Sequence, residues 1–72
     1  MRVFVTGVNG QLGHDVMLEL TKRGHEAIGS GSGDHYRSDD DVNSMPYAQL
    51  DITDEKKVLQ CITDLHPDAV IH

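Results

Sequence analysis

Three glycines spaced three residues apart stand where a phosphate group could approach the main chain. Residues 6–13 read TGVNGQLG and directly follow the apolar run RVFV. Gly7 would let the chain turn sharply off a strand, Gly10 would leave backbone N–H groups open to a phosphate, and Gly13 would let a helix pack closely. The N-terminus of that helix adds free N–H donors and a positive dipole end. In this strand-to-helix setting the motif predicts binding of a nucleotide pyrophosphate rather than an ordinary tight turn.

The flanking residues predict the elements that would position this loop. Residues 2–6 are apolar or β-branched without alternation, which is typical of a strand buried on both faces. Residues 11–23 carry apolar side chains at helical spacing and end at Gly24, a residue type that commonly terminates helices. Residues 25–29 predict a second strand, and residues 30–46 predict an irregular, mobile loop that contains a solvated acidic run.

The second half of the chain repeats this pattern. Residues 47–51 predict a third strand, and Thr53 is expected to cap a helix over residues 54–65. Residues 68–72 predict a fourth strand. The order β-α-β-loop-β-α-β predicts an α/β fold with a doubly wound parallel sheet and right-handed crossovers. We expect the strand order 3-2-1-4, with the two helices on opposite faces.

Charge and composition restrict the class of protein. The 72 residues include 12 acidic residues against 6 Lys and Arg, a net charge of −6, which argues against a nucleic-acid partner. The single cysteine, Cys61, cannot form an internal disulfide and is expected to act as a small buried hydrophobe. No apolar run approaches the length of a membrane span. We therefore expect a soluble, cytoplasmic chain with no membrane partner.

The number of histidines suggests metal binding, but their spacing does not support it. The five histidines show no ligand-like spacing, so no metal site is predicted. They are His14, His25, His35, His66 and His72.

Four stretches of the chain carry a family resemblance. MRVFVTGVNGQLGHDV, RGHE, LDITDEKKV and HPDAVIH resemble the N-terminus of the extended short-chain dehydrogenases/reductases. Within that group the chain most closely resembles the dTDP-4-dehydrorhamnose reductases, in which the N-G-Q-L-G loop and the D-I-T-D stretch recur together. The resemblance covers most of the chain except residues 30–46.

The resemblance implies a Rossmann-type fold and a nicotinamide cofactor, NADPH or NADH. It also implies reduction of the 4-keto group of dTDP-4-dehydro-6-deoxy-L-mannose to dTDP-L-rhamnose, for polysaccharide biosynthesis. A dTDP-sugar would then be the small-molecule substrate, and the protein could form a homodimer. Residues 1–72 would be the N-terminal part of the dinucleotide-binding domain.

Individual cofactor roles also follow from the resemblance. Gly10, Gln11 and Leu12 would line the pyrophosphate, and Asp51 with Ile52 would flank the adenine. The alternative for Asp51 is an Asx turn that merely starts the following helix. The full set of predicted cofactor-binding residues is Gly7, Asn9, Gly10, Gln11, Leu12, Gly13, Ser30, Asp51 and Ile52.

The end of the second strand departs from the pattern of NAD-preferring folds, which usually place an acidic residue there. The chain has Gly29 followed by Ser30, Gly31 and Ser32, the acidic Asp34 comes late, and Arg37 is nearby. Small hydroxyl residues beside a guanidinium would tolerate a 2′-phosphate, which favours NADPH.

No catalytic residue is predicted within these 72 positions. In the family resembled, a Tyr-x-x-x-Lys pair protonates the reduced carbonyl oxygen, but the residues four positions after Tyr36 and Tyr47 are both aspartates. Residues 1–72 alone are therefore expected to be inactive. They are also not expected to fold by themselves, because two helices cannot cover both faces of four strands.

Two other functions remain open from the sequence. One is a non-catalytic nucleotide-binding protein, similar to the regulatory subunit of methionine adenosyltransferase. The other is a different sugar-nucleotide epimerase or dehydratase.

Overall fold

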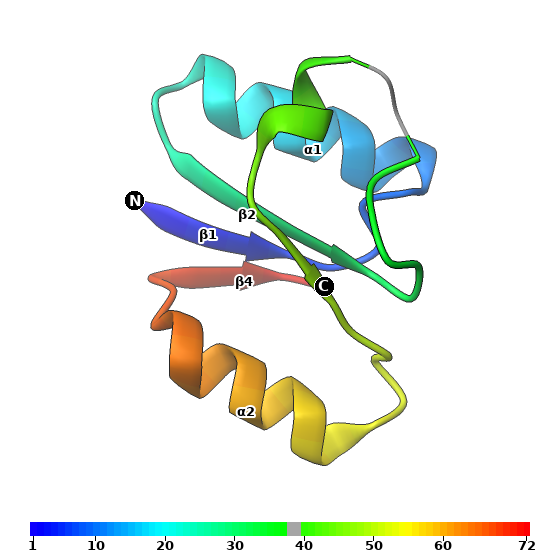
Figure 1. The fold of residues 1–72 in the computed structure, drawn as a ribbon. Coiled ribbons are helices and arrows are strands. Elements are labelled where there is room, and N and C mark those ends of the chain that lie inside the picture. Colours follow the sequence, from blue (N-terminus) through cyan, green and yellow to red (C-terminus); the bar gives the residue numbers. More distant parts are fainter. Residues whose placement is uncertain (38–39) are drawn as a thin grey trace.

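Parallel strands form the centre of the molecule, as the sequence predicts. In the computed structural model, which describes residues 1–37 and 40–72, the described residues contain one four-stranded sheet in the order β3-β2-β1-β4 (Figure 1). Every strand pairing is parallel. The strands are β1 (Arg2–Val5), β2 (Glu26–Gly31), β3 (Tyr47–Gln49) and β4 (Ala69–Ile71). The expected α/β class and strand order 3-2-1-4 are confirmed.

Helices α1 (Gln11–Lys22) and α2 (Glu55–Leu65) lie on opposite faces of this sheet (Figure 1). A short 3-10 helix, η1 (Asp41–Ser44), lies beside α1. No helix in the described part of the chain has the length and apolar character needed to cross a membrane.

The alternation of side chains along β1 and β2 builds a separate core on each face. On the α1 face, Val3, Val5 and Ala27 pack with Met17 and Val42. On the α2 face, Phe4, Ile28 and Leu50 form the buried cluster, and the α2 side chains Val58, Cys61, Ile62 and Leu65 pack against it. The two-sided burial predicted for β1 is confirmed, and Cys61 lies at the margin of the second core.

The second strand is longer than predicted. It continues to Gly31 because Gly29, Ser30 and Gly31 pair in register with the three residues of β3. Tertiary pairing therefore overrides the low strand propensity of the glycines. The prediction that this strand ends at Gly29 is wrong.

The residue that caps α2 also differs from the prediction. Asp54, not Thr53, is the N-cap, and its carboxylate accepts a hydrogen bond from the Lys57 N–H at 3.3 Å. Thr53 instead donates its N–H and hydroxyl to Asp51. A local Asx turn thus competes successfully for the threonine.

The connection between β2 and β3, predicted to be an irregular loop, contains structure of its own. Tyr36 and Val42 are buried against the α1 core, and η1 forms one short turn within it. Ser38 and Asp39 lie outside the described residues, and the prediction of an acidic run falls partly on them. Asp41, inside the run, is exposed.

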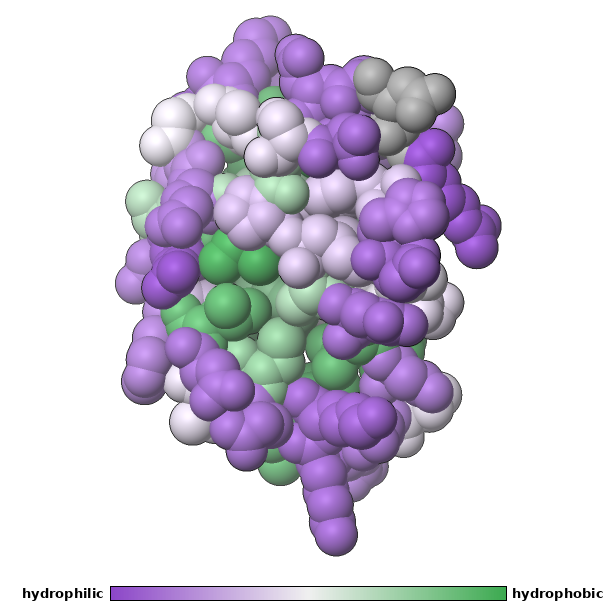
Figure 2. Space-filling view, viewed as in Figure 1, coloured by the Kyte–Doolittle hydropathy of each residue, from purple (hydrophilic) through white to green (hydrophobic). Residues whose placement is uncertain are grey.

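Apolar side chains remain exposed on the α2 face and at the β4 edge. Figure 2 shows apolar surface across the middle of the molecule, between the sheet and the polar side chains of the lower part. A groove of about 490 Å³ runs between α2 and the sheet and includes Ile52, Leu59 and Val70 in its lining. On β4, Val70 and Ile71 are 43% and 40% exposed.

Candidate functional site

The glycine-rich loop leaves β1 by a backbone turn that a glycine adopts easily. Gly7 has φ of +65°, in the left-handed region that side chains with a Cβ disfavour. The Val8 N–H then donates to the Ser30 carbonyl at 3.1 Å, and the Gly10 N–H donates to the Gly7 carbonyl at 3.2 Å. The loop is therefore held against the end of β2 before α1 begins.

Gly13 lies where a helix touches the loop's own backbone. A Cβ added at Gly13 would stand 2.3 Å from the Gly7 carbonyl oxygen and 2.9 Å from the Val8 Cα. Nothing larger than glycine fits without a shift of α1. The close helix packing that the sequence predicts for this position is confirmed.

Gly10 differs from Gly13 because the protein itself does not require a glycine there. A Cβ added at Gly10 would lie 3.5 Å from the Gly7 carbonyl oxygen, an ordinary contact. The backbone is extended, with φ of −84°, and the residue is exposed. Packing therefore does not explain the missing side chain, whereas a ligand that approaches the backbone would.

The N-terminus of α1, which begins after Gly10, is well suited to an anion. Among the described residues no side chain caps it, and its first turn contains no acidic residue. Its first N–H groups and the positive end of the helix dipole therefore face away from the helix without a protein carboxylate. Such a terminus binds phosphate groups.

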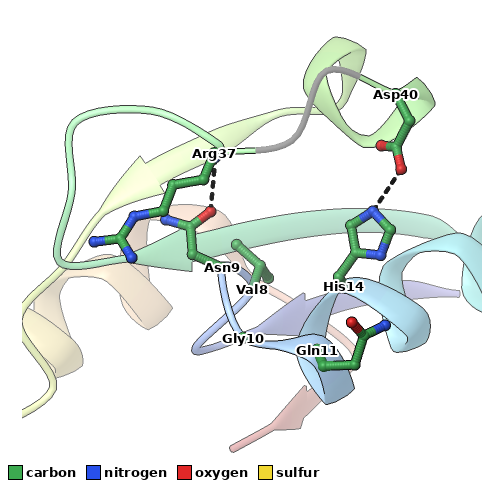
Figure 3. Close-up of a pocket in the computed structure, with 7 residues that line it drawn as sticks. All are labelled: Val8, Asn9, Gly10, Gln11, His14, Arg37 and Asp40. Carbon is green, nitrogen blue, oxygen red and sulfur yellow. Dashed lines mark hydrogen bonds and ion pairs between the residues drawn. The ribbon is translucent and has the colours of Figure 1, made fainter.

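A cleft of about 260 Å³ opens beside this terminus (Figure 3). One wall comes from the glycine-rich loop and the start of α1, and the other comes from the connection between β2 and β3. The lining residues are Val8, Asn9, Gly10, Gln11, His14, Arg37 and Asp40.

Hydrogen bonds join the two walls of this cleft. His14 Nε2 lies 2.6 Å from a carboxylate oxygen of Asp40, and the Arg37 N–H donates to Asn9 Oδ1 at 3.0 Å (Figure 3). The Arg37 guanidinium extends away from His14, on the Asn9 side of the cleft (Figure 3). A carboxylate oxygen of Asp15 also lies near His14, 3.7 Å from its Nδ1.

A second cleft, of about 330 Å³, lies on the opposite side of the same loop. Gly10 and Gln11 line both clefts, while Gly7, Leu12 and Gly13 line only the second. The structure therefore brings together every predicted residue of the loop around two adjoining spaces.

Ile52 lines the apolar groove, which adjoins the second cleft beside the loop. The groove and the second cleft share Thr6 and His72 in their linings, and the Thr6 hydroxyl lies 3.1 Å from His72 Nδ1. Ile52 is half exposed at the groove.

Asp51 lies two residues after β3, which ends at Gln49 and not at residue 51 as predicted. It forms the Asx turn that is the alternative in the sequence analysis. Its Oδ1 accepts hydrogen bonds from the Thr53 hydroxyl at 2.6 Å and the Thr53 N–H at 2.9 Å. These bonds hold the pKa of the Asp51 carboxyl below its ordinary value. The carboxylate is exposed, so its second oxygen is accessible to a ligand.

Ser30 is a predicted site residue whose side chain is enclosed by the protein itself. It is fully buried, and its hydroxyl donates to the Val5 carbonyl at 3.3 Å. The strand runs on past it to Gly31, so the hydroxyl that lies beyond the strand end belongs to Ser32, which is exposed.

Tyr36 and Tyr47 hold the connection between β2 and β3 in place. Their rings meet edge-on with centroids 4.7 Å apart. The Tyr36 hydroxyl donates to the Pro46 carbonyl and the Tyr47 hydroxyl to the Gly33 carbonyl. Burial raises the pKa of both hydroxyls, which keeps them protonated as donors.

Sequence reasoning did not identify the contacts that close the first cleft. The spacing of His14 indicates at most a metal ligand, and nothing in the acidic run that contains Asp40 indicates a partner for it. Pairs separated by 26 and 28 residues, as in His14–Asp40 and Asn9–Arg37, leave no periodic signal in a single sequence. Within residues 1–37 and 40–72, no group of three or more His, Cys, Asp or Glu side chains could hold a metal ion.

Known proteins are similar to this chain in sequence and in fold. A probable low-salt glycan biosynthesis reductase, Agl14 of Haloferax volcanii, is 38% identical over 72 residues, which is all of this chain and 22% of the relative. The UDP-sulfoquinovose synthase of Sulfolobus acidocaldarius is 38% identical over 64 residues, 82% of this chain and 16% of the relative. The chain thus spans about a fifth of these relatives.

A solved structure matches the whole fold. WbmH of Bordetella bronchiseptica, an enzyme solved in complex with NAD⁺, superposes with a TM-score of 0.75 and 36% sequence identity, over 100% of this chain and 25% of that one. The sequence model of the NAD dependent epimerase/dehydratase family matches residues 3–72. The glycine-rich loop, the parallel sheet and these matches lead to one conclusion: the chain belongs to the NAD dependent epimerase/dehydratase family.

Proposed function

We propose that this chain binds the dinucleotide cofactor of an NAD(P)H-dependent oxidoreductase that acts on a sugar nucleotide. The observation that carries the proposal is an exposed Gly10 that packing does not require to be glycine, next to a helix N-terminus that no side chain caps in the described residues. Family membership and the NAD⁺ bound to WbmH support the same assignment.

The residues around the loop fit such a cofactor. The N–H groups of Gln11 and Leu12 would bind the pyrophosphate, and Gly10 would let it approach them because it has no side chain. Gly7 and Gly13 would hold the loop in shape. Asp51 would accept a hydrogen bond from the adenine amino group through the oxygen that Thr53 leaves accessible, and Ile52 would pack on the ring. When bound, the cofactor supplies a hydride to a carbonyl carbon.

Arg37 and the end of β2 favour NADPH over NADH in this proposal. The strand ends at Gly31 and Ser32 follows it, so no acidic residue stands at the strand end that would hold a ribose 2′-hydroxyl. The first acidic residue, Asp34, comes later in the connection. A 2′-phosphate would meet the Arg37 guanidinium instead. Ser30 could contribute to this site only through its main chain, because its hydroxyl is buried.

We infer a dTDP-4-dehydrorhamnose reductase type of reaction for the full-length protein, with reduction of the 4-keto group of dTDP-4-dehydro-6-deoxy-L-mannose. The motif resemblance and the similarity to a glycan biosynthesis reductase support this choice. The family model and the similarity to a UDP-sulfoquinovose synthase favour a second candidate, a sugar-nucleotide epimerase or dehydratase. A regulatory nucleotide-binding role would require the rest of the protein to lack the Tyr-x-x-x-Lys pair.

The catalytic residues of the full-length protein are proposed to lie outside residues 1–72. The exposure of Val70 and Ile71 on the edge strand β4 supports a further strand and further helices beside it. The relatives, several times longer than this chain, are consistent with that division.

The decisive experiment is calorimetric titration of the full-length Gly10→Val protein with NADPH and NADH. The branched side chain would occupy the space needed by the pyrophosphate, so we expect at least a tenfold loss of affinity for both cofactors. The urea unfolding midpoint should stay close to that of the parent. Unchanged affinity in a folded variant would refute the phosphate-binding role of the loop.

A further inference from the structure

Asn9 occupies a place in the site that pyrophosphate binding does not explain. Its side chain is turned toward the connection between β2 and β3 and not toward the N-terminus of α1 (Figure 3). Oδ1 accepts the Arg37 N–H at 3.0 Å, and Nδ2 lies 3.5 Å from the His35 carbonyl oxygen. Because a backbone N–H can only donate, the bond to Arg37 also fixes which way the amide points.

The surroundings of Asn9 are shaped to receive this amide. A Cβ added at Gly31 would stand 3.3 Å from Asn9 Nδ2, and one added at Gly33 would stand 3.9 Å from it. Asn9 also reaches Tyr47: burial raises the pKa of the Tyr47 hydroxyl, and a hydrogen bond with Asn9 acts in the opposite direction. The glycines after β2 therefore leave room for a side chain from the glycine-rich loop.

Other contacts hold the rest of the connection without help from Asn9. Tyr36 and Val42 are buried in the α1 core, and Asp40 is bonded to His14 at the far side of the cleft. Within residues 1–37 and 40–72, Asn9 is the side chain that bonds to the Arg37 main chain. Its removal would release the Arg37 backbone locally and leave the connection docked.

We propose that Asn9 is a positioning residue that sets cofactor selectivity by fixing Arg37 at the end of the cleft where a ribose 2′-phosphate would lie. This inference rests on the proposed dinucleotide function. The bond is made by the Arg37 main chain. Asn9 therefore restricts the guanidinium indirectly, because it fixes the backbone from which the Arg37 side chain extends. A fixed guanidinium loses less conformational entropy when it binds a phosphate.

The test is a double-mutant cycle in the full-length protein, with dissociation constants for NADPH and NADH measured by calorimetry. Asn9→Ala should weaken NADPH binding about 5- to 20-fold and NADH binding by less than about 3-fold, so the NADH-to-NADPH ratio of dissociation constants should fall. In the Arg37→Ala background, which keeps the backbone N–H but lacks the guanidinium, Asn9→Ala should leave that ratio within about 2-fold.

Gln49→Ala is the matched control. Gln49 Nε2 donates to the Ser32 carbonyl at 3.1 Å, so this variant also removes an amide bond to the same connection but does not touch the cleft. It should leave the ratio unchanged. If Asn9→Ala does not fold, Asn9→Ser replaces it, because the shorter hydroxyl side chain stops short of the Arg37 N–H.

The outcomes separate the two proposals. A parent protein that binds neither cofactor refutes the proposed function. A parent that binds both, with Asn9→Ala lowering both affinities equally, refutes the positioning role alone. A change of ratio that persists without the Arg37 guanidinium also refutes it, because Asn9 would then act directly on the cofactor.

Discussion

Replacing Gly13 and Gly10 by alanine should separate a glycine that the fold needs from one that a ligand needs. At Gly13 the added Cβ would stand 2.3 Å from a carbonyl oxygen, where ordinary contact begins at 3.4 Å. The neighbouring atoms are backbone and cannot rotate away, so α1 must move away from the glycine-rich loop by about 1 Å. Overpacking of this kind costs about 3 kcal/mol, and alanine returns about 1 kcal/mol of helix propensity.

The expected net loss at Gly13 is therefore about 2 kcal/mol. At Gly10, an alanine N-cap costs up to about 1 kcal/mol relative to glycine, and the less flexible unfolded chain returns about 0.4–1 kcal/mol. The two effects nearly cancel because the Gly10 backbone is already extended.

Urea unfolding of the full-length protein without cofactor measures both changes. With an m value of about 2 kcal/mol/M, Gly13→Ala should lower the midpoint by about 1 M, and Gly10→Ala should leave it within about 0.3 M of the parent. Equal midpoints for the two variants would refute the reasoning, as would a larger loss at Gly10.

Three further predictions concern α2 and its approach. Asp54→Ala should lower the free energy of unfolding by about 1 kcal/mol through loss of the N-cap bond to Lys57, whereas Asp54→Asn should retain most of it; urea midpoints check this. Burial raises the pKa of the Cys61 thiol, so iodoacetamide should alkylate the native protein at pH 8 more slowly than the urea-unfolded protein, and a native rate equal to the unfolded one would contradict this. Hydrogen bonds from Thr53 lower the pKa of Asp51, so its stabilising contribution is present above its ordinary pKa and lost as pH falls through the lowered value. Thr53→Val should raise the Asp51 pKa in an NMR titration, and an unchanged value would show that Thr53 is not the cause.

The sequence predicted the fold well because its signals are local. The β-branched run at residues 2–6, the helical spacing after Gly10 and the repeated order of elements specify a parallel sheet with few alternatives. The roles of Gly7 and Gly13 followed from the same strand-to-helix context. Both were found in the structure as a left-handed turn and a close backbone contact.

What sequence reasoning missed depends on distant partners. The extension of β2 to Gly31 requires β3 as a neighbour, and the burial of Ser30 follows from that extension. Thr53 does not cap α2 because its hydroxyl donates to Asp51, and Asp54 is the N-cap instead. The bond between Asn9 and Arg37 joins two loops that only the folded sheet brings together.

The bond between the Val8 N–H and the Ser30 carbonyl has a consequence for folding. It ties the glycine-rich loop to β2, so we expect the loop to reach its native shape only after β1 and β2 have paired. A ligand of this loop therefore binds the native chain and has little affinity for the unfolded one. By mass action, such a ligand at 100 times its dissociation constant adds about 2.7 kcal/mol to the free energy of unfolding. A ligand bound at the loop would therefore stabilise the whole sheet through this contact, and the stability of the protein would then depend on the concentration of that ligand.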